Sequence, residues 1–256
     1  MENGIHVALA PEVLGTFLGL PITNTLVTAW AVMLLLIVIA FTVGRKVNLM
    51  PSKFQTILEW AFEYVYDYVA ETLESKALAT KFFPFLMTIF LFIFTSNLIE
   101  YFPGIGSVGF FKPIEGHLFE FFPLLRSVNT DLNVTLALAI ISFITIEVTG
   151  FATIGMWKYI GKFIDVKHGA IGFAVGLVEL IGEFARLISL SFRLFGNILA
   201  GEVLIIVATF FAPYFGPVPL MMFELFIGFL QAAIFALLTL FFIKLAITDA
   251  HAAEAH

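Results

Sequence analysis

Five stretches of the chain are apolar over about 20 residues or more, and they constrain its fold more than any other feature. They cover residues 24–43, 82–101, 134–157, 172–211 and 218–248. A helix needs about 20 apolar residues to cross the roughly 30 Å hydrocarbon core of a bilayer. Of the 256 residues, 61% are hydrophobic and 12% charged, whereas soluble domains have about 45–50% and about 25%. The sequence therefore predicts an all-α polytopic membrane protein with five transmembrane helices, folded as a single integral membrane domain over residues 1–256.

The last two apolar runs are longer than one crossing requires. As a helix, residues 172–211 would be about 60 Å long, about twice the hydrocarbon thickness. Because ordinary tilt cannot absorb that excess, we expect this helix to lie strongly tilted in the membrane or to bend, at Gly196 or Gly201. The run at residues 218–248 is long as well, so both last spans are expected to be long and oblique.

Residues 51–80, between the first two spans, have the pattern of an amphipathic helix. Apolar residues recur there at helical spacing among Glu59, Glu63, Asp67 and Glu71, which is typical of a helix that lies on the membrane surface. A helical hairpin that dips into the interface and a helix that docks a partner are equally compatible with this pattern. The loop at residues 102–132 is rich in Gly and Pro, so we expect it to be irregular, re-entrant at most.

Lys and Arg residues are distributed unequally between the two sides of the predicted membrane. Eight flank the loops on one side, and two lie on the other: Arg45, Lys46, Lys53, Lys76, Lys81, Lys158, Lys162 and Lys167 against Lys112 and Arg126. Cytoplasmic loops carry the excess of positive residues. The N-terminus is therefore expected outside, and the C-terminus on the cytoplasmic or matrix side, with residues 51–80 on the inner surface.

Several classes of chemistry do not fit this composition. The chain has no Cys, which excludes disulfides, iron–sulfur clusters and thiolate zinc sites. Its five His fall in expected loops and tails, which argues against axial haem ligation. It has no basic run suited to nucleic acid and no phosphate-binding glycine loop. We therefore expect no cofactor, no metal site and no nucleic-acid partner.

The fourth apolar run contains an unusual number of polar side chains. Five of them fall on one stripe of a helix, within about 40° of Glu179: Glu179, Glu183, Arg186, Arg193 and Asn197. The three nearest the cytoplasmic end could simply pair with one another or reach water. Arg193 is different, because its nearest acids on the same helix are nine and ten residues away. A charge at that depth costs several kcal/mol, so we expect it to face a carboxylate on another helix or subunit.

The fifth run is antiparallel to the fourth, which gives a geometric test. Glu202 lies nine residues outward from Arg193, a rise of about 13.5 Å, and Glu224 lies seven residues outward from Gln231, about 10.5 Å. If Arg193 and Gln231 face each other, both glutamates lie together in the outer half of the membrane.

Other polar residues fall on one side or the other of this level. Asn97, Glu100, Asp131 and Asn133 lie at the outer ends of their spans, whereas Glu179 and Glu183 lie on the inner side of Arg193. A continuous pore would have no fixed cation between its two halves. The pattern indicates two offset half-paths, so that an ion must be carried across the gap by something else.

Three motifs resemble subunit a of F-type ATP synthases. They are SFRLFGNILAGE at residues 191–202, FELFIGFLQA at 223–232 and DLNVTLALA at 131–139. The resemblance covers essentially the whole chain, in order. It implies a non-catalytic stator subunit with two oblique helices around a rotating ring of c subunits, in which Arg193 matches the essential arginine and Gln231 the family's glutamine. Glu202 and Glu224 occupy positions where relatives have acid/His pairs, and a glutamate at both departs from some of them.

The resemblance also implies partners and a location. The partners would be the c-ring, subunit b or the peripheral stalk, the remaining Fo and catalytic-head subunits and the lipid membrane, which would be a bacterial inner membrane or a mitochondrial inner membrane. The expected ion is a proton, with Na⁺ as the alternative, because selectivity lies mainly in the carboxylate site of the ring. The alternative function is a secondary ion-coupled transporter, which the absence of an internal repeat argues against.

Overall fold

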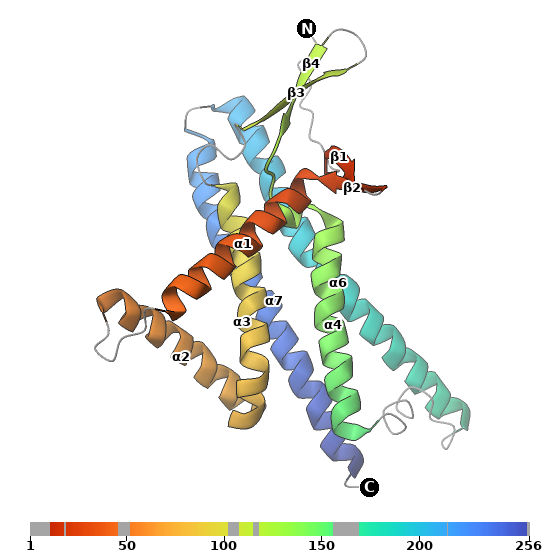
Figure 1. Cartoon of the computed structure of the whole chain (residues 1–256). Coiled ribbons are helices and arrows are strands. Elements are labelled where there is room, and N and C mark those ends of the chain that lie inside the picture. Colours follow the sequence, from red (N-terminus) through yellow and green to blue (C-terminus); the bar gives the residue numbers. More distant parts are fainter. Residues whose placement is uncertain are drawn as a thin grey trace. The chain divides into compact units, whose positions relative to one another are not determined.

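The computed structural model describes residues 11–17, 19–45, 52–101, 108–114, 118–155, 169–213 and 215–254. Six α-helices dominate this part of the chain (Figure 1): α1 Asn24–Gly44, α2 Lys53–Leu73, α3 Lys76–Glu100, α4 Leu132–Ile154, α6 Gly169–Phe211 and α7 Pro217–Glu254. Two antiparallel hairpins accompany them, β1 Val13–Phe17 with β2 Leu20–Thr23, and β3 Gly109–Ile114 with β4 Leu118–Pro123.

The five predicted membrane spans are confirmed. The helical segments Asn24–Gly44, Lys76–Glu100, Leu132–Thr153, Phe173–Phe211 and Pro217–Thr248 are long and apolar enough to cross a bilayer. Large apolar side chains cover the surface of α1, where Leu34 and Ile37 are 63% and 64% exposed. In water such exposure would be costly, whereas lipid tails solvate these side chains as well as a protein core does. The chain is a multi-pass membrane protein.

The two last helices are long, as the sequence predicts. α6 has 43 residues and α7 has 38, so α6 is about 65 Å long at 1.5 Å per residue. α6 continues as a helix through Gly196 and Gly201, so neither glycine interrupts it.

The surface helix is shorter than predicted. α2 begins after Ser52, whose side chain accepts a hydrogen bond from the Gln55 N–H, and it ends at Leu73, before Glu74 in a left-handed conformation with φ of 52°. α3 already begins at Lys76, so residues 76–80 belong to the second span. The mostly polar sequence around this turn hid the break, because it has no Gly or Pro to mark it.

The prediction that the loop at residues 102–132 is irregular was wrong in part. It contains the β3–β4 hairpin and a 3-10 helix, Val128–Thr130. Each strand includes a Phe-Phe pair, and aromatic residues favour strands. The Gly and Pro content of the loop obscured this signal, because those residues are depleted in strands.

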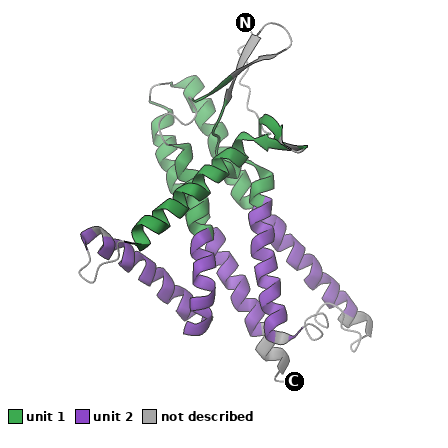
Figure 2. Cartoon of the chain, viewed as in Figure 1, with its two compact units in different colours: residues 1–50, 89–135, 193–233 green, residues 51–88, 136–192, 234–256 purple. Residues whose placement is uncertain are grey.

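The described chain forms two compact units (Figure 2). Unit 1 consists of residues 1–50, 89–135 and 193–233, and unit 2 of residues 51–88, 136–192 and 234–256. α3, α4, α6 and α7 each contribute residues to both units. A single integral membrane domain over residues 1–256 stays a prediction.

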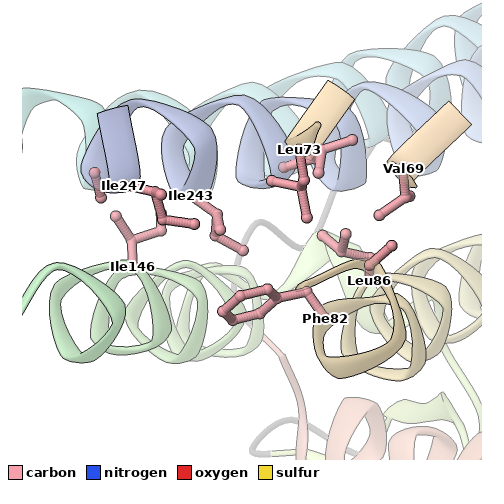
Figure 3. Close-up of a cluster of buried hydrophobic side chains, with 10 residues drawn as sticks. Val69, Leu73, Phe82, Leu86, Ile146, Ile243 and Ile247 are labelled. Carbon is pink, nitrogen blue, oxygen red and sulfur yellow. The ribbon is translucent and has the colours of Figure 1, made fainter. Parts of the chain in front are cut away.

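A cluster of buried apolar side chains forms the core of unit 2 (Figure 3). It joins α2, α3, α4 and α7 through a set that includes Val69, Leu73, Phe82, Leu86, Ile146, Ile243 and Ile247. Val69 and Leu73 are apolar residues in the C-terminal half of α2, and they are 2% and 5% exposed. The surface helix is therefore packed on the spanning helices through its C-terminal half.

One ion pair supports the same packing at the turn after α2. Lys244 Nζ on α7 donates a hydrogen bond to Glu74 Oε1 at 2.6 Å. This bond and the charge of Lys244 lower the pKa of Glu74. The ionised carboxylate is thus the form that the folded protein favours.

This contact predicts an acid-sensitive contribution to stability. Because the pKa of Glu74 is lower in the folded protein, the contribution is present above the unfolded pKa of about 4.3 and is lost as pH falls through the folded pKa. We expect Lys244→Met to lower the unfolding temperature of the detergent-solubilised protein slightly at pH 7, and the difference from wild type to shrink progressively as the pH falls below about 4. Lys53→Met, at an exposed position of α2, is the control. A difference that is the same at both pH values contradicts the prediction.

Candidate functional site

Buried amides connect three elements of unit 1. Asn129, in the 3-10 helix, donates a hydrogen bond to Asn97 Oδ1 on α3 at 2.6 Å, and Asn97 Nδ2 donates to the backbone oxygen of Gly228 on α7 at 3.0 Å. Asn97 is 2% exposed and Asn129 is fully buried. A Cβ on Gly228 would lie 3.0 Å from the Cβ of Asn97, so the glycine allows α7 to approach α3 closely.

Asp131 and Asn133 form the start of α4. Asp131 Oδ1 accepts hydrogen bonds from the Asn133 backbone N–H at 2.9 Å and from Asn133 Nδ2 at 3.0 Å. Its Oδ2 accepts a hydrogen bond from Thr25 Oγ1 on α1 at 2.8 Å. These are the contacts of a helix N-cap, and they fix α4 to α1.

Glu202 pairs with an arginine from the loop that follows the β3–β4 hairpin. Arg126 Nη2 lies 3.2 Å from Glu202 Oε2 on α6, and the two side chains are 9% and 23% exposed. The sequence reasoning used Arg126 only to count loop charges and missed this role. The sequence does show that Arg126 is a positive residue close to the polar start of a span. Nothing in the sequence indicates that its side chain reaches α6.

Glu224 lies against Gly201. A Cβ on Gly201 would overlap the Glu224 carboxyl group, so the absence of a side chain there leaves room for the carboxyl on the face of α6. Glu224 is 5% exposed, and its Oε1 has no hydrogen-bond partner in the described part of the chain. Since Gly201 is adjacent to Glu202, this contact brings the two glutamates of α6 and α7 into the same region, as the rise along antiparallel helices predicts.

Glu100, at the end of α3, completes the group. It interacts electrostatically with Glu202, Glu224 and Arg126, and its buried Oε2 finds no hydrogen-bond partner among the described residues. Burial and the negative charges of Glu100, Glu224 and Glu202 raise the pKa of the neighbouring Tyr101. We call Glu100, Arg126, Glu202 and Glu224 the carboxylate cluster.

Arg193 and Asn197, in contrast to the carboxylate cluster, lie on an exposed face of α6. Both are exposed on α6, whereas Leu194 and Ile198, each one residue further on, are 1% and 2% exposed. α6 therefore packs Leu194 and Ile198 inward and presents Arg193 on the outside of this chain. Gln231, on α7, is 8% exposed. The predicted approach of Gln231 to Arg193 stays a prediction.

In unit 2, the pairing weighed from the sequence is found. Arg186 Nη1 donates a hydrogen bond to Glu183 Oε2 at 2.6 Å, one helical turn away. The guanidinium also lies over the ring of Phe242 on α7, 4.3 Å from its centre. Glu183 is 6% exposed, and Glu179 is half-buried on the same helix.

These groups are suited to hold and pass on a small cation. Across the described residues, no three His, Asp or Glu side chains are grouped so that they could hold a metal ion. The carboxyl groups can take up and release protons. The arginines fix where negative charge is stable.

Comparisons with known proteins agree with the motifs and with the five spans. The sequence profile of the ATP synthase A chain family matches residues 26–244. The chain is 31% identical to the "ATP synthase subunit a, sodium ion specific" of Propionigenium modestum, over 96% of this chain and 81% of that protein. It is 30% identical to the ATP synthase subunit a of Legionella pneumophila strain Paris, over 88% of this chain and 86% of that one. The subunit a of Geotalea daltonii is 31% identical, over 87% and 86%. This chain belongs to the ATP synthase A chain family.

Proposed function

We propose that this chain is the ion-translocating stator subunit of an F-type ATP synthase, with two offset half-channels that lead to and from carboxylates of a rotating c-ring. One observation carries the proposal. α6 presents Arg193 on the surface of the chain, and the same helix places Glu202 in the carboxylate cluster nine residues further on. An arginine exposed on this face is open to contact with another subunit of the complex, and the ring is the partner that family membership implies.

The outer half-channel contains the carboxylate cluster. Glu202 and Glu224 serve this outer path as a coupled pair, and Glu100 lies within electrostatic range of both. Asn97, Asp131 and Asn133 frame this region, because their hydrogen bonds hold α3, α7 and the start of α4 in place. Glu179 and Glu183 of unit 2 serve the inner half-channel.

Rotation follows from the charge of the ring carboxylate. After it receives a proton from the outer path, the carboxyl group is neutral and can face lipid at tolerable cost. After nearly a full turn it releases the proton to the inner path. Arg193, with Asn197 beside it on the exposed face, favours the ionised carboxylate at that point and repels a proton that would leak directly. A charge that crosses the potential supplies about 2.3 kcal/mol per 100 mV, which gives the rotation its direction.

The remaining expectations concern the assembly. The partners are the c-ring, subunit b or the peripheral stalk, and the other Fo and catalytic-head subunits, which carry the nucleotide chemistry, so this chain is non-catalytic. The ion proposed is a proton. The N-terminus lies outside and the C-terminus inside. Lys46, Lys158, Lys162 and Lys167, which contribute to this orientation, lie outside the described residues.

The central test is Arg193→Ala. We expect this variant to abolish ATP synthesis driven by an ion gradient in reconstituted vesicles, because no cation then favours release from the ring carboxylate. The complex should still assemble, since Arg193 is exposed on this chain, and passive proton leak should persist or rise. Arg45→Ala removes an exposed arginine at the end of α1 and is the control. Normal synthesis in the Arg193 variant, at native assembly levels, contradicts the assignment. Purification separates the alternative function: a secondary ion-coupled transporter would purify without a c-ring, whereas this chain should purify with one.

A second prediction concerns the outer path. Glu202→Gln and Glu224→Gln should each slow ion entry without stopping it, because another carboxyl group of the cluster can still carry the proton. The rate of ATP synthesis as a function of pH on the outer side measures the effect. Cysteines at positions 202 and 224 should react with a water-soluble reagent added outside. Reaction only from the cytoplasmic side would overturn the orientation.

A third prediction concerns Gln231. We expect it to orient the guanidinium of Arg193 while remaining neutral. Gln231→Glu should impair coupling more than Gln231→Asn, although it keeps the side-chain length, because an acid would hold Arg193 in a permanent ion pair. Cysteines at 193 and 231 should form a crosslink with a short reagent. A crosslink from 193 to α4 and none to 231 would contradict the paired-helix geometry.

A further inference from the structure

Arg126, the arginine of the carboxylate cluster, is held in place by hydrogen bonds of the loop that follows the β3–β4 hairpin. The backbone N–H of Arg126 donates a hydrogen bond to Thr28 Oγ1 on α1 at 3.1 Å, and that hydroxyl donates to the backbone oxygen of Asn24 at 2.9 Å. The next four residues of the loop are at most 3% exposed. Their hydrogen bonds reach α3 through Asn129. A guanidinium on such a loop has a fixed position, because the residues around it cannot move without breaking buried hydrogen bonds.

Negative charge exceeds positive charge in this cluster. Glu100, Glu202 and Glu224 come from three helices, and Arg126 contacts Glu202 at 3.2 Å. Charge-assisted contact with a guanidinium stabilises the ionised form of a carboxyl group. Glu100 Oε2 and Glu224 Oε1 are buried without a hydrogen-bond partner within the described residues, and such a carboxyl group is more stable when it is neutral.

Among the residues that the structure describes, the other titratable groups near the cluster do not alter this balance. Tyr101 follows Glu100 and lies within electrostatic range of all three carboxylates, and a tyrosine hydroxyl with an ordinary pKa of about 10 is already neutral at physiological pH. Asp131 uses both carboxyl oxygens in hydrogen bonds to Thr25 and Asn133. The three glutamates and Arg126 therefore decide where a proton is held.

We propose that Arg126 is a positioning residue for ion entry: it keeps Glu202 ionised, so that the entering proton is carried by Glu224 and Glu100. This inference rests on the proposed function and deepens it. Glu202 then acts as a fixed negative charge whose effect Arg126 offsets. The net charge of this pair determines the proton affinity of the other two carboxyl groups. Glu224, seated against Gly201, is the carrier on α7, the helix that also bears Gln231.

The experiment uses the intact ATP synthase in vesicles, with the rate of gradient-driven synthesis measured against pH on the outer side. In Arg126→Gln, the charge of Glu202 is uncompensated and increases the proton affinity of its neighbours. We expect the midpoint of the pH profile to rise by about one unit, a tenfold change in proton affinity. Arg126→Lys should stay near wild type. The double variant Arg126→Gln/Glu202→Gln, which has neither charge, should return the midpoint close to the wild-type value.

Controls separate this inference from a structural role and from the function itself. Arg45→Gln, which changes an exposed arginine, should leave the profile unchanged, and the amount of this subunit in the purified complex reports assembly. If Arg126→Gln and the double variant lose activity equally, with an unshifted midpoint, Arg126 only supports the fold and the inference is overturned. If Arg126→Gln fails to assemble, Glu202→Gln, which leaves the charge of Arg126 uncompensated, should lower the midpoint, and an unshifted midpoint in that variant overturns the inference. A wild-type profile in Glu224→Gln would instead refute the outer-path assignment.

Discussion

Uncompensated charge is expensive in a bilayer, and the polar parts of this protein are organised around that cost. A charged group in the hydrocarbon core costs several kcal/mol, so each buried carboxylate needs a cation, a proton or a set of donors. Glu202 has Arg126, Glu183 has Arg186, and Asp131 has hydroxyl and amide donors. Glu224 and Glu100 each keep a buried oxygen without such a partner in the described chain. A group of this kind is suited to gain and lose a proton.

The helices of this protein associate by other means than the helices of a soluble protein. Between helices in lipid, close packing and hydrogen bonds replace the hydrophobic effect as the source of association. Gly201 and Gly228 illustrate this, because each lets a polar side chain of another helix, Glu224 or Asn97, lie directly on the helix backbone. The same small residues that allow close packing thus place the functional groups of unit 1.

Much of the architecture could be predicted because hydropathy and charge act locally along the chain. The five spans, the unusual length of α6 and the pairing of Glu183 with Arg186 follow from runs of apolar residues and from helical spacing. The β3–β4 hairpin and the end of α2 at Leu73 could not be predicted in the same way. Strand pairing and a left-handed turn at Glu74 depend on contacts that local composition does not encode.

By itself, the sequence determined that this chain has five spans long and apolar enough to cross the membrane and that an arginine lies far inside the fourth span, and it predicts glutamates at 202 and 224 at matching depths on antiparallel helices. The helix rise and the cost of charge in lipid fix these points residue by residue. Only the tertiary structure decided that Arg126 reaches Glu202, that Glu224 rests on Gly201, and that Arg193 faces outward. Those contacts join segments far apart in the chain, and the packing of α1, α3, α6 and α7 selects them, which no local pattern records.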